Sequence, residues 1–253
     1  MIRILVARLT IVALILAGLA RSLPAQSQKP TIVLVHGAWA DASGWYDVTV
    51  ALQARGYKVV AVQNALFSYA KDIETTKRVF DAQQGPIVVV GHSYGGAVIT
   101  AAAAGNPNLK SLVYVAAFAP DSNEAIGALL QRYPDLGLGT ALAPDAAGFL
   151  YIDPAKYAEV FANGLPPTQA RAFATAQKPI AGSALGEPLT VAPAWKTVPS
   201  WYVVATQDRA INPELERFMA KRMHARVTEL PAGHLVFISR AQDIARIIES
   251  ASQ

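Results

Sequence analysis

The stretch Ile87–Gly95 constrains the fold of this chain more than any other segment. It opens with a run of β-branched apolar residues, Ile87–Val90, which is typical of a strand buried on both faces. The turn sequence Gly-His-Ser-Tyr-Gly follows, and small residues that favour a helix continue from there to Ala104. This order predicts a strand, a sharp turn and a helix, with Ser93 at the centre of the turn.

The turn predicted around Ser93 would give that residue a chemical role. Glycine at positions 91 and 95 is needed because the strand and helix backbones pass too close together for a side chain. Ser93 would point out above the sheet at the start of a helix, where backbone N–H groups and the helix dipole favour negative charge. The pattern also occurs by chance in chains rich in glycine and serine, but the strand before it and the helix after it favour a nucleophile.

Five further segments are predicted to be strands, and segments with helical periodicity alternate with them. This alternation predicts an α/β fold with a mostly parallel sheet of about six strands and helices on both faces, for which 253 residues suffice. The expected strands are Thr31–Val35, Lys58–Val62, Leu109–Val115, Trp201–Ala205 and Arg226–Leu230. The expected helices are Trp45–Arg55, Tyr69–Gln83, Pro213–Met223 and Ala241–Ala251.

The alternation breaks at Pro120. Residues 121–199 hold no strong strand run, and they contain short helix candidates separated by turns rich in proline and glycine. We therefore expect a helical lid inserted between a first core part, residues 26–120, and a second core part, residues 200–253. Most aromatic residues of the insertion would pack it onto the core, and a few would face a substrate. The helix candidates are Glu124–Arg132, Pro154–Ala162 and Pro166–Gln177.

Residues 1–25 have the pattern of a secretory signal peptide. Arg3 and Arg8 make the start basic, the stretch Leu9–Ala20 is apolar and uncharged, and Ala25 is a small residue suited to cleavage before Gln26. The alternative is an uncleaved anchor, but the apolar stretch is short against the ~20 residues of a spanning helix. We expect an exported protein, periplasmic or extracellular, with no stable membrane anchor after cleavage.

Composition excludes several kinds of chemistry. The chain has no cysteine, which excludes disulfides, thiolate nucleophiles and cysteine-bound metals. The signal peptide holds three arginines and no acidic residue, so its removal lowers the formal net charge from +4 to +1. No cluster of lysine and arginine is interleaved with aromatic residues, and we therefore expect no nucleic-acid partner.

Ser93 needs a general base, and His234 is the best placed of the four histidines. Loops at the carboxyl ends of parallel strands line the site of an α/β sheet, and His234 follows the last predicted strand. It therefore shares an edge with Ser93. His92 lies within the turn itself, and His36 is better explained as a structural residue of its loop. His224 lies among basic residues at a helix end, where a surface position is expected.

Asp208 is the candidate partner for this base. It follows the strand before His234, in the same kind of loop. The order Ser93, Asp208, His234 is that of the α/β-hydrolase catalytic triad, in which the histidine takes the serine proton and the carboxylate holds the imidazole. The alternative for Asp208 is a cap of the helix that begins at Pro213, although it lies rather far upstream.

Two backbone N–H groups would stabilise an oxyanion formed at Ser93. One donor belongs to the residue after the nucleophile, Tyr94, and the other to the loop after the first strand, at Ala38.

The chain resembles the α/β-hydrolase superfamily over residues 31–252. Three segments are similar to small esterases of the plant methylesterase and hydroxynitrile lyase group: H-G-A-W-A-D-A-S-G-W at 36–45, G-H-S-Y-G-G-A-V-I at 91–99 and L-V-Y-V-A-A-F-A-P at 112–120. That group carries a helical lid at the position of residues 121–199. The resemblance implies a hydrolase without metal or cofactor that acts on small-molecule carboxylic esters.

One departure from that group bears on the substrate. Its hydroxynitrile lyases carry a lysine beside the catalytic histidine, whereas Leu235 follows His234 here. This argues against cyanohydrin cleavage and for an apolar acyl or alcohol pocket. The lid together with Trp39, Tyr94, Phe118 and Leu235 predicts small to medium apolar esters, and Trp39, Phe118 and Leu235 are the substrate-binding candidates. The alternatives are perhydrolysis, lactone opening or C–C bond hydrolysis by the same triad. A ligand-binding protein of slow turnover is a more distant one.

Overall fold

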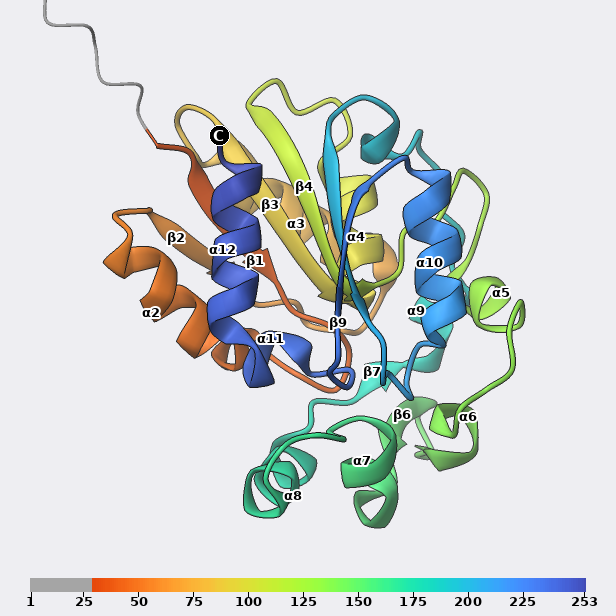
Figure 1. The fold of residues 1–253 in the computed structure, drawn as a ribbon. Coiled ribbons are helices and arrows are strands. Elements are labelled where there is room, and N and C mark those ends of the chain that lie inside the picture. The colour runs from red at the N-terminus through yellow and green to blue at the C-terminus, as the bar shows by residue number, and fades with distance from the viewer. Residues whose placement is uncertain (1–28) are drawn as a thin grey trace, which may run out of the picture.

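Six parallel strands form the centre of the molecule (Figure 1). The computed structural model describes residues 29–253, so the predicted signal peptide lies outside the described residues. The order across the sheet is β2-β1-β3-β4-β8-β9, which confirms the predicted parallel α/β architecture. The strands are β1 (Thr31–Val35), β2 (Val59–Val62), β3 (Ile87–Ser93), β4 (Leu109–Ala117), β8 (Ser200–Ala205) and β9 (Arg226–Leu230).

Helices cover both faces of this sheet. α12 packs against α2 on one face, and α3 packs against α4 on the other, where α4 also contacts β3 (Figure 1). Within residues 29–253, every helix falls short of the length and apolar character that a membrane span requires. The core helices are α2 (Tyr46–Ala54), α3 (Tyr69–Asp81), α4 (Tyr94–Ala102), α10 (Pro213–Arg222), α11 (Val236–Ser239) and α12 (Ala241–Ala251), and the 3-10 turn η1 (Ala42–Trp45) precedes α2.

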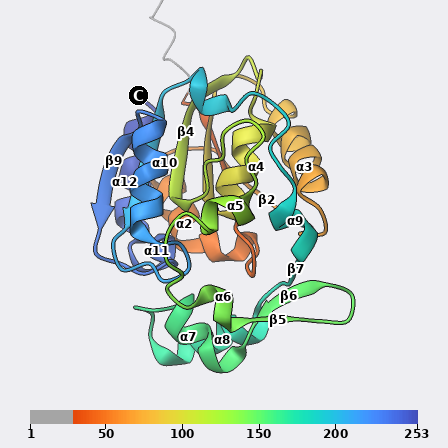
Figure 2. The same ribbon diagram turned by 90° about the vertical axis from the view of Figure 1, so that its right-hand side faces the viewer.

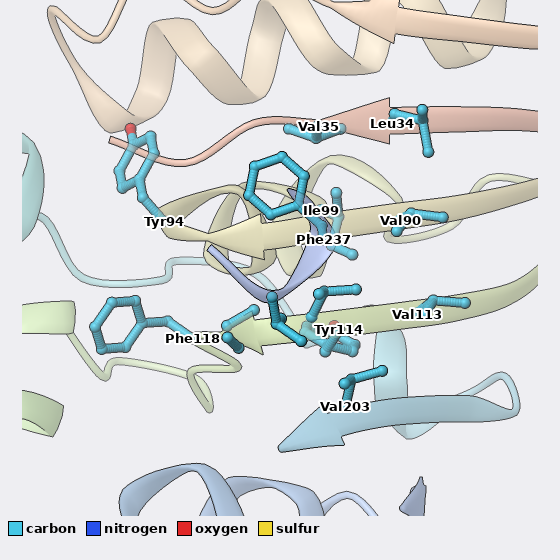
Figure 3. Packing of buried hydrophobic residues seen from close by; sticks show 14 of the residues in the cluster. Leu34, Val35, Val90, Tyr94, Ile99, Val113, Tyr114, Phe118, Val203 and Phe237 are labelled. Atoms are coloured by element: carbon cyan, nitrogen blue, oxygen red, sulfur yellow. The ribbon is translucent and has the colours of Figure 1, made fainter. Parts of the chain in front are cut away.

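The middle of the sheet is apolar on both sides. Every residue of β3 and of β1 is buried, as expected for parallel strands between two layers of helices. Figure 3 shows Val90, Val113 and Val203 on the adjacent strands β3, β4 and β8. Ser93 therefore stands at the end of a strand whose position is set by packing on all sides.

The segment between β4 and β8, which we predicted to be a helical lid, lies at the carboxyl ends of the strands (Figure 2). It contains helices near all three predicted positions, and also a small antiparallel sheet that the sequence did not predict. These strands have two to four residues each and are too short to show alternation. The elements are α5 (Ile126–Leu130), α6 (Leu138–Ala141), β5 (Leu142–Pro144), β6 (Phe149–Ile152), α7 (Pro154–Val160), α8 (Pro167–Ala176), β7 (Ile180–Ala181), α9 (Gly182–Gly186) and η2 (Ala194–Lys196).

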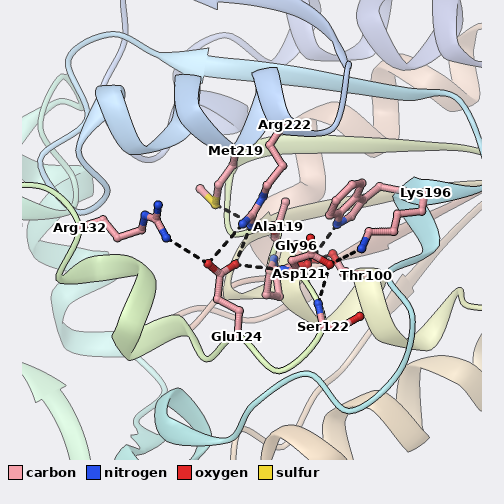
Figure 4. A network of polar contacts seen from close by, with 12 residues as sticks. Gly96, Thr100, Ala119, Asp121, Ser122, Glu124, Arg132, Lys196, Met219 and Arg222 are labelled. Atoms are coloured by element: carbon pink, nitrogen blue, oxygen red, sulfur yellow. Dashed lines mark hydrogen bonds and ion pairs between the residues drawn. The ribbon is translucent and has the colours of Figure 1, made fainter.

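A polar network joins the start of this insertion to the core (Figure 4). Arg222 at the end of α10 donates to the Glu124 carboxylate at 2.7 Å and to the carbonyl oxygen of Ala119 at 2.6 Å. Lys196, near the end of the insertion, pairs with Asp121 near its start. Both ends of the insertion are therefore held beside α10.

Candidate active site

The turn at the end of β3 places Ser93 in an unusual backbone conformation. Its φ is +52° and its ψ is −125°, a region that side chains disfavour at a cost of order 1–3 kcal/mol. The strand continues to Ser93 itself, beyond the apolar run at Ile87–Val90, and α4 begins at the next residue. The predicted strand–turn–helix is therefore present, with Ser93 as the N-terminal cap residue of α4.

Glycines make this turn possible because three backbones converge on it. A Cβ at Gly91 would lie 2.7 Å from the carbonyl oxygen of Gly95, and a Cβ at Gly95 would lie 2.6 Å from the carbonyl oxygens of Val35 and His36. A Cβ at Gly37 would lie 2.7 Å from the Cβ of Ser93. The loop after β1 is thereby pressed against the serine turn, which places Ala38 next to it.

The structure brings Ser93, His234 and Asp208 together in one chain of hydrogen bonds. The Oγ of Ser93 lies 2.9 Å from Nε2 of His234, and Nδ1 of His234 lies 2.6 Å from Oδ2 of Asp208. An ionised carboxylate can only accept, so Nδ1–H donates to Asp208 and Nε2 is left to accept the hydroxyl proton of Ser93. All three side chains are buried. The arrangement can carry a proton away from the serine hydroxyl.

The loop after β8 holds Asp208 in a fixed orientation. Its Oδ1 accepts from the backbone N–H of Ala210 at 2.7 Å and from that of Ile211 at 2.9 Å, which leaves Oδ2 facing His234. The alternative that Asp208 caps α10 is wrong, because the Asn212 side chain accepts from the N–H of Glu214 and occupies the cap position.

His92 holds the backbone of His234, a role that the sequence did not indicate. Its Nε2 lies 3.0 Å from the carbonyl oxygen of His234, which can only accept, so the imidazole donates. Burial holds the pKa of His92 well below its ordinary value, and the ring stays neutral. It packs between His234 and Phe237, with ring centroids 4.7 Å and 4.4 Å away. Its place inside the serine turn was the one signal available.

The two predicted oxyanion residues, Ala38 and Tyr94, both line the cavity at Ser93. The Tyr94 hydroxyl donates to Oδ2 of Asp72 at 2.9 Å, and Oδ1 of Asp72 accepts from the N–H of Leu66. Burial raises the pKa of both the Tyr94 hydroxyl and the Asp72 carboxyl. The tyrosine side chain is thus anchored to α3 and keeps the first residue of α4 in place.

The cavity at Ser93 is small, and it adjoins a larger one. Its volume is about 20 Å³, and two of the substrate-binding candidates, Trp39 and Phe118, line it. A groove of about 390 Å³ lies next to it, and Leu130, Leu138 and Ala210 line both spaces. The groove is otherwise formed by residues 131–142 of the insertion and by the start of α10.

Leu235, the third predicted substrate-binding residue, lines a separate cavity of about 70 Å³. Trp39 lines this cavity as well as the one at Ser93, so this residue lies between them. The indole N–H donates to the carbonyl oxygen of Leu150 at 2.8 Å, and the ring meets Phe161 edge-on at 5.7 Å between centroids. The insertion therefore fixes the wall between the two cavities.

His36 is a buried neutral histidine below the site, in agreement with its predicted structural role. Its Nε2 accepts from the N–H of Asn64 at 3.0 Å, so its Nδ1–H donates to the carbonyl oxygen of Gly37 at 2.8 Å. Burial lowers its pKa from 6.5 to about 4. Protonation would place a hydrogen on Nε2, and the backbone N–H of Asn64 would then lose its acceptor.

Because the pKa of His36 is low in the folded protein, we expect the protein to lose stability in mild acid. The unfolded chain binds the proton near pH 6.5 and the folded chain only near pH 4, so the free energy of unfolding should fall between those values by about 3 kcal/mol. His92 contributes in the same direction. Urea unfolding of wild type and of His36→Gln, followed from neutral pH to about pH 4, checks this. An equally steep pH dependence in the variant would assign the loss to other groups.

Within residues 29–253, no three His, Asp or Glu side chains are grouped closely enough to hold a metal ion.

Comparison with known proteins agrees with this architecture. The sequence profile described as "Alpha/beta hydrolase family" matches residues 32–247. The carbendazim hydrolyzing esterase of Nocardioides sp. (strain SG-4G) is 27% identical over 243 residues, which cover 84% of this chain and 96% of that protein. Methylesterase 8 of Arabidopsis thaliana is 29% identical over 153 residues, 53% of this chain and 56% of the relative.

Solved structures show the same fold. An extracellular alpha/beta-hydrolase from a Paenibacillus species superposes with a TM-score of 0.76 at 20% identity, over 88% of this chain and 99% of the other. A pyrethroid hydrolase from Sphingobium faniae JZ-2 superposes with a TM-score of 0.71 at 22% identity, over 88% and 97%. With a family profile that spans most of the chain and a serine turn, sheet order and insertion that agree with it, this protein belongs to the alpha/beta hydrolase family.

Proposed function

We propose that this protein is a serine esterase that hydrolyses carboxylic esters of small to medium apolar molecules through an acyl-enzyme. The observation that carries the proposal is the unbroken hydrogen-bond chain from Ser93 through His234 to Asp208 at the floor of an apolar cavity. Relatives named as a carbendazim hydrolyzing esterase and as methylesterases support an ester as the bond that is cleaved.

The geometry suits both halves of such a reaction. His234 accepts the proton of Ser93 as its Oγ attacks the ester carbonyl, and Asp208 stabilises the imidazolium. The N–H groups of Ala38 and Tyr94 are the proposed donors to the oxyanion. His234 then protonates the leaving alcohol and afterwards activates the water that hydrolyses the acyl-enzyme.

The sizes of the cavity and the groove suggest where the two halves of an ester bind. A space of about 20 Å³ at Ser93 holds little more than a small group, since one water needs about 10–15 Å³ on this measure. The groove of about 390 Å³ beyond Leu130 and Leu138 is large enough for a bulky apolar half. We infer esters in which one side of the carbonyl is small and the other is larger and apolar.

Hydrolysis of p-nitrophenyl esters from acetate to palmitate tests this proposal. We expect turnover that is fastest on short acyl chains and falls as the chain lengthens. A preference for palmitate would contradict the cavity argument. Turnover confined to lactones or to peroxide-dependent halogenation would favour the alternative reactions of the same triad. A single stoichiometric release of p-nitrophenol, without further turnover, would indicate a ligand-binding protein.

Leu138 should control access to the groove, because it lines both the groove and the cavity at Ser93. The substitution Leu138→Trp is expected to lower kcat/KM for 2-naphthyl acetate by about 10–100-fold and to affect ethyl acetate little. Ala176→Trp is the matched control, since Ala176 lines only the separate cavity beside Leu235. If the control lowers naphthyl ester turnover and Leu138→Trp does not, the bulky half occupies that other cavity.

A further inference from the structure

Glu216 is a buried residue in the first half of α10, the helix that follows the loop carrying Asp208. Its side chain is 0% exposed. Its Oε2 accepts from the N–H of Ala205, the last residue of β8, at 3.1 Å. Its Oε1 has no donor among the described residues. A buried carboxylate with one amide for two oxygens would be costly, and such a group requires either a cation or a proton.

Glu216 and Asp208 are both bound to the backbone of Ala205, which donates its N–H to Glu216 and accepts from the N–H of Asp208 at 3.0 Å. Asp208 already accepts from two backbone amides at Oδ1 and from His234 at Oδ2. Neighbouring carboxyls in a buried site repel each other when both are ionised, which favours a proton on one of them. Asp208 has three donors to stabilise a negative charge and Glu216 has one, which assigns the charge to Asp208 and the proton to Glu216.

The other polar groups near Glu216 do not change this assignment. The Arg217 guanidinium is partly exposed and is engaged by Glu214 and Glu229 on the surface. The Tyr202 hydroxyl donates to the carbonyl oxygen of Ala117. Burial first, and then the negative charge of Asp208, raise the pKa of Glu216 well above its ordinary value. Both effects favour the protonated, neutral form of the Glu216 carboxyl.

We propose that Glu216 is a positioning residue whose protonated Oε1 donates a hydrogen bond to Asp208 and so holds that carboxylate toward His234. This inference rests on the proposed function, in which Asp208 orients the imidazole. A neutral donor stabilises the rotamer of Asp208 without adding a second negative charge beside the imidazolium. The contact also ties the loop after β8 to α10.

Two substitutions separate this role from simple packing. In Glu216→Gln the side-chain carbonyl can accept from Ala205 while the amide donates to Asp208, so kcat and the shape of the pH profile should stay close to wild type. Glu216→Leu keeps the bulk and removes the donor, and it should lower kcat by about 10–100-fold with little change in KM, because Asp208 is less well positioned. Glu214→Gln removes an exposed carboxylate from the same helix and is the matched control.

The outcomes are distinct. If Glu216→Gln displaces the low-pH limb of the kcat/KM profile, a buried negative charge has been removed and the proposal is wrong. If Glu216→Leu folds and retains wild-type kcat, Glu216 only packs. Thermal unfolding shows whether each variant is folded, and Glu216→Gln keeps the test valid if the leucine variant is not.

The protonation state can be measured without turnover. Infrared spectra at neutral pH should contain the C=O stretch of a protonated buried carboxyl in wild type, and this band should be absent from Glu216→Gln. Identical spectra would overturn the assignment of the proton. Because this readout needs no substrate, its failure is distinguishable from a failure of the esterase proposal, which would appear as a folded wild-type protein that turns over no ester.

Discussion

Replacing Ser93 with alanine should lower kcat for ester hydrolysis by about 10⁵–10⁶-fold. The Oγ of Ser93 is the proposed nucleophile, and it lies 2.9 Å from Nε2 of His234, the proposed base. Without it, only the oxyanion donors and substrate binding remain, which give a small residual rate. The fold should survive, because alanine meets the same backbone strain at φ +52° that serine does. Loss of one buried hydrogen bond costs about 1 kcal/mol.

Steady-state kinetics and covalent labelling together check this result. An organophosphate ester should add its mass to wild type at Ser93 and leave Ser93→Ala unmodified. Ser43→Ala is a suitable control, since Ser43 is exposed in the turn that precedes α2. If Ser93→Ala retains substantial turnover while folded, the nucleophile is another residue and the esterase mechanism proposed above is wrong.

Asp208→Asn should reduce kcat by about 10⁴-fold, and the loop after β8 explains why. The N–H groups of Ala210 and Ile211 both point at Oδ1, so they select an oxygen at that position. The new amide nitrogen must then occupy the Oδ2 position and donate to Nδ1 of His234. That bond forces the imidazole proton onto Nε2, which can no longer accept the proton of Ser93.

The measurement is kcat on a short-chain p-nitrophenyl ester, with thermal unfolding as the folding control. Asp145→Asn is the matched substitution, because Asp145 also accepts from two backbone amides, those of Ala147 and Phe149, in the exposed turn between β5 and β6. It should leave kcat unchanged. A loss of less than about tenfold in Asp208→Asn would mean that the tautomer of His234 is set by another group.

Local sequence accounts for most of the fold. The bounds of β1 and β9 agree with the prediction, because Gly37 soon follows the apolar run of β1 and Pro231 ends β9. The serine turn was also predictable. Its two glycines, Gly91 and Gly95, are required where the backbones of the strand, the helix and the loop after β1 pass close together. The strands β5–β7 were not, because each is very short and pairs with residues distant in sequence.

The proximity of Ser93, Asp208 and His234 followed from the sequence by itself, because parallel strands bring their carboxyl ends to one edge and each residue follows such a strand. Only the tertiary structure decided which side chains support them. His92 donates to the carbonyl oxygen of His234, and Glu216 on α10 is buried against Ala205, to whose backbone Asp208 is also bound. Leu235 faces a different cavity from its neighbour His234. Side-chain direction and contact depend on packing between segments far apart in the chain, and no local pattern records that packing.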